Sequence, residues 1–143
     1  MVALDIESID QKQQHIRECV KLLKTMREQG VSVDDKIRLG AVKHYLIMAI
    51  EAILDICNHI LVEELALKPA SYEDIIVLMG KEQLISADLS KRSAGIGKFR
   101  NKLIHEYMEV DDEKVLNYFK IAPEQFEEFD KALLGILKNK KIK

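Results

Sequence analysis

The feature that most constrains the fold is the spacing of the apolar residues, which recur every three or four positions through most of the chain. Residues 6–26 place them on one helix face, and Gly30 follows as a stop signal. Ser32, with Asp35 three residues later, predicts an amino-terminal cap for a long second helix that runs to about Leu65. The first half of the chain is therefore expected to be two long helices.

The second half contains shorter patterns of the same period. Ser71 caps a predicted helix over 71–79 that Gly80 ends, and a fourth helix is predicted over 86–107, weakened by Gly95 and Gly97. Another begins near Asp111, and a last one follows Pro123. These patterns predict an all-α fold, an antiparallel up-and-down bundle of five to six helices forming one domain over 1–143, with a basic tail at 138–143.

Composition excludes several classes of protein. The formal net charge is −2, from 22 basic and 24 acidic residues, so the chain is not expected to coat nucleic acid through its overall field. Cys19 and Cys57 lie in apolar helical patterns and are predicted to be buried, without a disulfide or zinc site.

Residues 45–62 form the most apolar stretch, but Glu51, Asp55, Asn58 and His59 interrupt it, which indicates a core helix and not a membrane span. No export signal is recognised at the amino terminus, so a cytoplasmic location is expected.

Residues 99–107, Phe-Arg-Asn-Lys-Leu-Ile-His-Glu-Tyr, combine side chains suited to phosphodiester chemistry. The planar guanidinium of Arg100 can bind phosphate, His105 can exchange a proton near neutral pH, and the amide of Asn101 can orient either group. RNA supplies its own nucleophile, the 2′-hydroxyl beside the scissile phosphate. These groups could therefore cleave RNA with neither a metal nor a cofactor.

Helix geometry adds a constraint on this segment. At 3.6 residues per turn, Asn101 and His105 lie about 40° apart around the helix, whereas Arg100 and His105 lie about 140° apart. One helix cannot easily direct both charged groups at one phosphate. A two-fold homodimer that set two such helices side by side would bring both pairs into one cleft.

The order Arg100, Asn101, then His105 after three further residues resembles the signature of the HEPN superfamily. With Tyr107 two residues later, it is similar to the HepT toxin ribonucleases, and the likeness extends over roughly residues 34–137, including 50–59 and 68–72. The resemblance implies a homodimer that cleaves RNA, with His105 in the acid–base role, Arg100 binding phosphate and Asn101 orienting them. It implies further that Tyr107 accepts AMP from an MntA-type nucleotidyltransferase antitoxin.

Other polar residues are candidates for supporting roles around this cleft. Glu51, Asp55 and His59 follow one another at four-residue spacing on the second helix, with His44 on the same stripe; they are either a wall of the cleft or ordinary surface and core polarity. Lys102 belongs to a basic helix, opposed by acidic residues at 124–130, that either guides RNA or is simply solvated. No metal site is predicted.

The sequence thus favours a metal-independent endoribonuclease toxin. An alternative is a non-catalytic helical dimer that binds a nucleotide or a nucleotidyltransferase partner through the same cleft. A purely structural helical protein is the third hypothesis.

Overall fold

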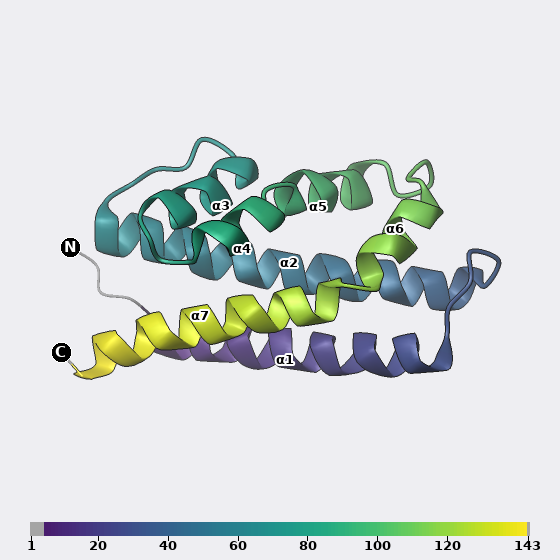
Figure 1. Ribbon diagram of the computed structural model, residues 1–143, viewed down its shortest axis with the longest axis horizontal. Helices are drawn as coiled ribbons and strands as arrows, with labels where there is room; N and C mark the ends of the chain where they lie inside the picture. The colour runs from purple at the N-terminus through teal and green to yellow at the C-terminus, as the bar shows by residue number, and fades with distance from the viewer. Residues whose placement is uncertain (1–4, 143) are drawn as a thin grey trace.

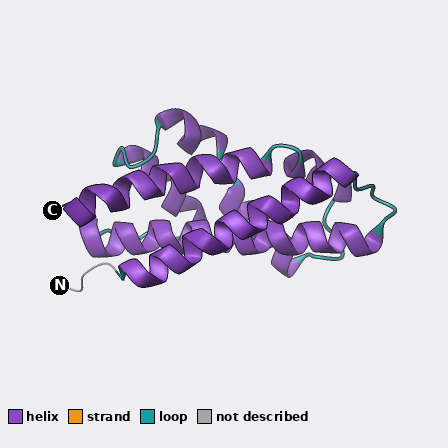
Figure 2. Cartoon of the chain, turned by 90° about the horizontal axis from the view of Figure 1, so that it is seen from below, coloured by secondary structure: helices purple, strands orange, loops and turns teal. Residues whose placement is uncertain are grey.

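The long apolar helix of the first half lies at the centre of the fold. The computed structural model describes residues 5–142, and α2 (Lys36–Leu65) packs there against both α1 (Ile6–Gln29) and α7 (Ala122–Ile142). Figure 1 shows α1 running antiparallel to α2 and to α7, with both ends of the chain at the same side of the molecule. Figure 2 shows the same helices from below.

A second layer covers the opposite side of α2. It consists of α3 (Tyr72–Lys81), the short α4 (Ala87–Arg92) and α5 (Ile96–His105), while α6 (Asp112–Phe119) connects this layer to α7 (Figure 1). Residues 5–142 contain seven helices and no strand, so the predicted all-α bundle is confirmed. The seventh helix arises because one expected helix is divided in two.

That division is a correction to the expected fourth helix over 86–107. The chain turns at Ser93 and Gly95, where the Ile96 amide donates to the Ser93 carbonyl at 3.1 Å, and α5 starts anew at Ile96. A Cβ on Gly97 would lie 2.9 Å from the Tyr72 carbonyl carbon, so this glycine allows α5 to approach α3 closely. The helix also ends at His105 and not at Tyr107, because the chain turns again after Glu106.

Two helix boundaries also differ from the expected ones. The side chain that caps α2 is that of Asp35, which accepts from the Arg38 amide at 3.1 Å, whereas Ser32 lies in the preceding turn. Gly80 does not end α3, which continues to Lys81. A Cβ at Gly80 would lie 2.3 Å from the Ser90 hydroxyl oxygen, so the glycine is needed for close packing on α4.

The core forms around α2, which buries a broad apolar face against its neighbours, whereas His44, Asp55 and Asn58 remain exposed on the other face. Phe126 and Phe129 of α7 are fully buried, and burial of one such side chain stabilises a fold by about 1.5–3 kcal/mol. By length and composition alone α2 could cross a membrane, but more than half of its most apolar stretch is buried against its neighbours. This is the environment of a core helix, as predicted.

Both cysteines are buried and unpaired, as predicted. Burial raises the pKa of the Cys57 thiol to about 12 and that of Cys19 to about 11. The expected basic tail at 138–143 continues α7 as far as Ile142, and position 143 lies outside the described residues. Residues 1–4 also lie outside the described residues, and the prediction that no export signal is present concerns that part of the chain.

Candidate functional site

Arg100 is the best-anchored of the predicted site residues. Its Nη2 donates to the Glu51 carboxylate of α2 at 2.6 Å, and its Nη1 donates to the Asn101 side-chain oxygen at 2.9 Å. The guanidinium carbon lies 4.8 Å from the centre of the Tyr72 ring, a cation–π contact. The side chain is only 15% exposed, so three neighbours from three helices set the orientation of this cation.

The anchored guanidinium still has donors to offer. Glu51 and Asn101 each take one N–H from a different terminal nitrogen of Arg100, which leaves a second N–H on each of these nitrogens. Two parallel N–H groups are the arrangement that binds a phosphate or carboxylate in bidentate fashion. Arg100 therefore retains N–H groups beyond the two that anchor it.

His105 has a different environment. It is the last residue of α5 and its side chain is exposed. Within the described part of the chain its imidazole makes no hydrogen bond or ion pair, in contrast to the Arg100 guanidinium. A ring in this state can exchange protons with a bound molecule.

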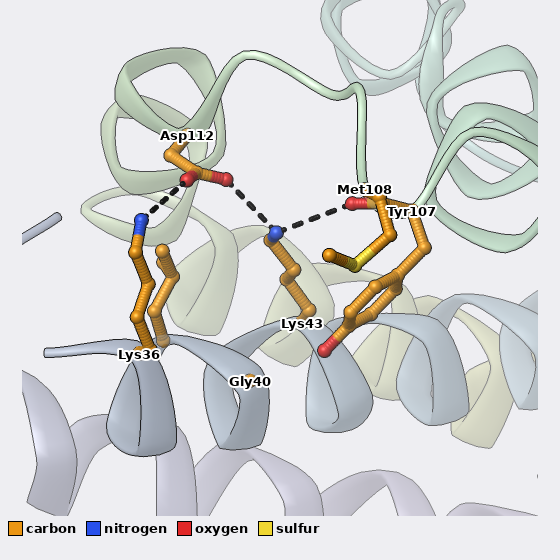
Figure 3. A pocket seen from close by; sticks show the side chains of 7 residues that line it. Lys36, Gly40, Lys43, Tyr107, Met108 and Asp112 are labelled. Carbon is orange, nitrogen blue, oxygen red and sulfur yellow. Dashed lines mark hydrogen bonds and ion pairs between the residues drawn. The ribbon is translucent and has the colours of Figure 1, made fainter.

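Tyr107 lies in the connection that follows α5, and its ring turns toward α2. The Lys43 ammonium is 4.6 Å from the ring centre and donates to the Tyr107 carbonyl at 3.4 Å. Figure 3 shows the ring lying over α2 near Gly40. Its hydroxyl is 3.3 Å from where a Gly40 Cβ would be. Tyr107 thus contacts residues other than those around Arg100.

The predicted supporting residues fall into two places. Glu51 contacts Arg100 directly, and Asp55 lies one turn further along α2. Burial raises the pKa of the Asp55 carboxyl, and the positive charges of Lys12 and Arg100 offset part of this rise. Lys102 instead lines a separate pocket of about 290 Å³, together with Phe99, Glu106, Glu109, Val110, Asp111 and Lys114. Its supporting role stays a prediction.

Comparison with known proteins gives the family. The model of the family described as "Ribonuclease HepT-like" matches residues 12–133. The chain belongs to the HepT-like ribonuclease family. The resemblance inferred from the segment of Arg100, Asn101, His105 and Tyr107 is confirmed, and so is the prediction of a ribonuclease at the level of the family.

Two characterised relatives and one solved structure are similar to this HepT-like chain. A tRNA nuclease HepT from Aphanizomenon flos-aquae is 28% identical over 104 residues, covering 68% of this chain and 69% of that protein. An mRNA nuclease HepT from Shewanella oneidensis is 28% identical over 115 residues, covering 80% and 86% respectively. The tri-AMPylated HEPN toxin of Shewanella oneidensis in complex with an MNT antitoxin has a TM-score of 0.78 and 26% identity, over 89% of this chain and 96% of that one.

Sequence reasoning about this HepT-like protein missed the roles of Tyr72 and Lys43. Tyr72 is 37% exposed and stacks on Arg100, a contact for which the sequence offers no signal. Lys43 falls four residues after Leu39, on the apolar face of α2, and only 8% of its side chain is exposed. A lysine at a core position was the signal that could have found it.

The histidines of the α2 stripe have structural contacts. His59 Nε2 accepts from the Asp5 backbone amide at 3.1 Å, which ties the start of α1 to α2. His44 makes an edge contact with the Tyr45 ring at 5.1 Å between centroids. Among the described residues, no group of three or more His, Cys, Asp or Glu side chains could hold a metal ion.

Ion pairs neutralise much of the charge that distinguishes the basic segment before Lys102 from the acidic segment at 124–130. Arg92 binds both Glu128, at 2.7 Å, and Asp88, at 2.8 Å. The other acidic side chains of the 124–130 segment bind α1, through the pairs Arg27–Glu124, Lys24–Glu127 and Arg17–Asp130. These carboxylates hold α1, α4 and α7 together, so steering of RNA by this asymmetry is not supported by the contacts.

Proposed function

We propose that this chain is a metal-independent endoribonuclease toxin that cleaves RNA at a site completed by a second copy of itself. The observation that carries the proposal is the anchoring of Arg100 by Glu51 and Asn101, which holds this cation in place and leaves further N–H groups on it. The two nuclease relatives, named for action on tRNA and mRNA, support RNA as the substrate.

The proposed reaction uses three kinds of side chain, and His105 acts from both copies. The 2′-hydroxyl of the substrate attacks the adjacent phosphorus, so that a 2′-O–P bond forms and the P–O5′ bond breaks. His105 of one chain takes the 2′-hydroxyl proton, and the same residue of the second chain protonates the leaving 5′-oxygen. Arg100 stabilises the added negative charge on the phosphate oxygens, and Asn101 holds Arg100 in place.

The second copy is required because His105 lies on a different side of α5 from Arg100, about 140° around the helix axis. Ile104 is 37% exposed and Met108 is 90% exposed, so apolar side chains flank His105 on both sides along the chain. An exposed apolar surface of this kind is suited to a self-complementary two-fold contact.

The partner we propose is an MntA-type nucleotidyltransferase antitoxin, by analogy with the MNT antitoxin bound to the Shewanella oneidensis toxin. In the proposed modification the Tyr107 hydroxyl oxygen attacks the α-phosphorus of ATP, the bond to pyrophosphate breaks, and the phenol proton passes to solvent. Single-domain organisation over 1–143 and a cytoplasmic location are part of the same proposal.

The decisive experiment is RNA cleavage by the purified chain, free of any antitoxin, in the presence of a metal chelator. Wild-type protein should cleave, while Arg100→Ala and His105→Ala should each lose at least a hundredfold in rate, the size expected for an electrostatic or acid–base group. The exposed residue Lys98 supplies a matched control, since Lys98→Ala should cleave as the wild type does. Cleavage that persists in both site variants would refute the assigned roles. A wild-type protein that never cleaves but binds a nucleotidyltransferase would favour the non-catalytic alternative.

A further inference from the structure

A second pocket lies between α2, the connection after α5, and the start of α6. Its volume is about 370 Å³, large enough for a phosphate group. Figure 3 shows that α2 contributes two lysines that both point to Asp112 of α6, and that Tyr107 covers one side. The lining residues are Lys36, Leu39, Gly40, Lys43, Tyr107, Met108 and Asp112.

The charges in this pocket favour an anion. The Lys43 ammonium lies 2.8 Å from the Asp112 carboxylate and the Lys36 ammonium lies 3.5 Å from it, so two cations share one anion among the lining residues. The Lys43 side chain is only 8% exposed, which makes its charge costly to leave uncompensated.

Tyr107 forms one wall of the pocket, beside α2. The Tyr107 hydroxyl lies 3.3 Å from the position of a Gly40 Cβ, so a larger residue at this point would push the ring by a few tenths of an ångström. Gly40 lies one helical turn from Lys36, on the same side of α2. An anion placed beside the hydroxyl would therefore lie close to the ammonium of Lys36, which is 75% exposed and can change its partner.

We propose that this pocket binds a phosphate group of a nucleotide, and that Lys36 and Lys43 move to the phosphate oxygens from the Asp112 carboxylate. The phosphate has two possible sources: a strand of RNA, or an AMP group attached to Tyr107. The second source rests on the modification proposed above, whereas the first does not.

The test begins with the unmodified protein, whose backbone amide resonances are observed by NMR during two separate titrations. One titration uses 5′-AMP, and the other uses a short DNA oligonucleotide, which lacks the 2′-hydroxyl and is therefore not cut. Saturable shifts at the Gly40 and Met108 amides are expected. Lys36→Gln should weaken binding about fivefold, as for one exposed charge pair, and the matched control Lys81→Gln, at the end of α3, should not.

Asp112→Asn gives the sharpest outcome. Because Asp112 competes with the phosphate for both lysines, its neutralisation should strengthen binding by about the same fivefold factor. A purely structural pair would instead give weaker binding or none. Absence of saturable shifts in the wild type, equal binding in Lys36→Gln, or weaker binding in Asp112→Asn would each overturn the proposal.

A second arm separates the two sources of phosphate. If mass spectrometry shows AMP on Tyr107, the modified protein should no longer bind the oligonucleotide at this pocket, and the ³¹P resonance of the attached phosphate should move in Lys36→Gln but not in Lys81→Gln. If no AMP is attached, the regulatory part of the proposed function fails, and the titrations of unmodified protein still decide whether the pocket binds phosphate.

Discussion

The Arg100 guanidinium donates to the Glu51 carboxylate at 2.6 Å, a contact between residues 49 positions apart in the sequence. It joins the helix of the candidate site to the central helix of the bundle. Since Asn101 and Tyr72 contact the same guanidinium, the orientation of the phosphate-binding group depends on the packing of three helices.

Replacement of Glu51 by glutamine should lower the rate of RNA cleavage about tenfold, because Arg100 loses a charge-assisted hydrogen bond that contributes about 1.5 kcal/mol. The free energy of unfolding should fall by no more than about the same 1.5 kcal/mol, since Glu51 is partly exposed. Initial cleavage rates and thermal melting measured by circular dichroism check both expectations. Glu18→Gln, on the exposed face of α1, is the control, and an unchanged rate in Glu51→Gln would show that the anchor is dispensable.

Substitution of Gly97 by alanine should destabilise the fold by about 1–3 kcal/mol, because the new methyl group would overlap the Tyr72 backbone. Since Tyr72 stacks on Arg100, cleavage should also fall at temperatures where the variant remains folded. Urea unfolding and cleavage assays measure the two effects. Gly135→Ala in α7 meets no atom within 4 Å and should leave stability equal or higher, and a similar response of both variants would contradict the packing argument.

The Arg27–Glu124 ion pair should stabilise the fold at neutral pH but not at strongly acidic pH. Two hydrogen bonds from Arg27, at 2.6 and 2.7 Å, lower the pKa of the Glu124 carboxyl in the folded state. Its contribution is therefore present above the unfolded pKa of about 4.3 and is lost as the pH falls through the lower folded pKa. Glu124→Gln should cost about 0.5 kcal/mol at pH 7, a small value because solvent screens the pair, and nothing at pH 2.5.

Urea unfolding of wild type and Glu124→Gln at the two pH values measures this difference. An equal cost at both would show that the carboxylate charge is not responsible. Lys24→Gln, which removes the partner of Glu127 on the same pair of helices, should show a smaller effect because that ion pair has a single contact at 2.8 Å.

Ile104→Glu should weaken the proposed homodimer, because the new charge would lie beside its symmetry-related copy in the contact. Sedimentation equilibrium should then show a dissociation constant raised at least tenfold. Cleavage per chain should fall at low protein concentration and recover at high concentration. Ile121→Glu, at a similarly exposed residue between α6 and α7, should behave as wild type; loss of activity in Ile104→Glu without any change in association would argue against a composite site.

Local signals in the sequence were sufficient to predict most of the helices, but not the division of 86–107 into α4 and α5. A cap such as Ser71 or Asp111 satisfies backbone donors within three residues, and the apolar spacing defines one face of a single helix, so neither depends on distant parts of the chain. The segment of Arg100, Asn101 and His105 was likewise found from its order alone. Glycines were harder to interpret, because Gly80 serves packing against Ser90 rather than helix termination.

What only the tertiary structure decided is which side chains meet. Three contacts join residues that lie 28 to 64 positions apart in the sequence. They are the pairing of Glu51 with Arg100, the stacking of Tyr72 on Arg100, and the contact of Tyr107 with Lys43. Such contacts depend on how the helices cross and where the chain turns between them. The sequence by itself thus determined most of the helices and the chemical groups of the site, because caps and apolar spacing act over a few residues. Packing determined how those groups are oriented, because burial joins residues that are far apart in the chain.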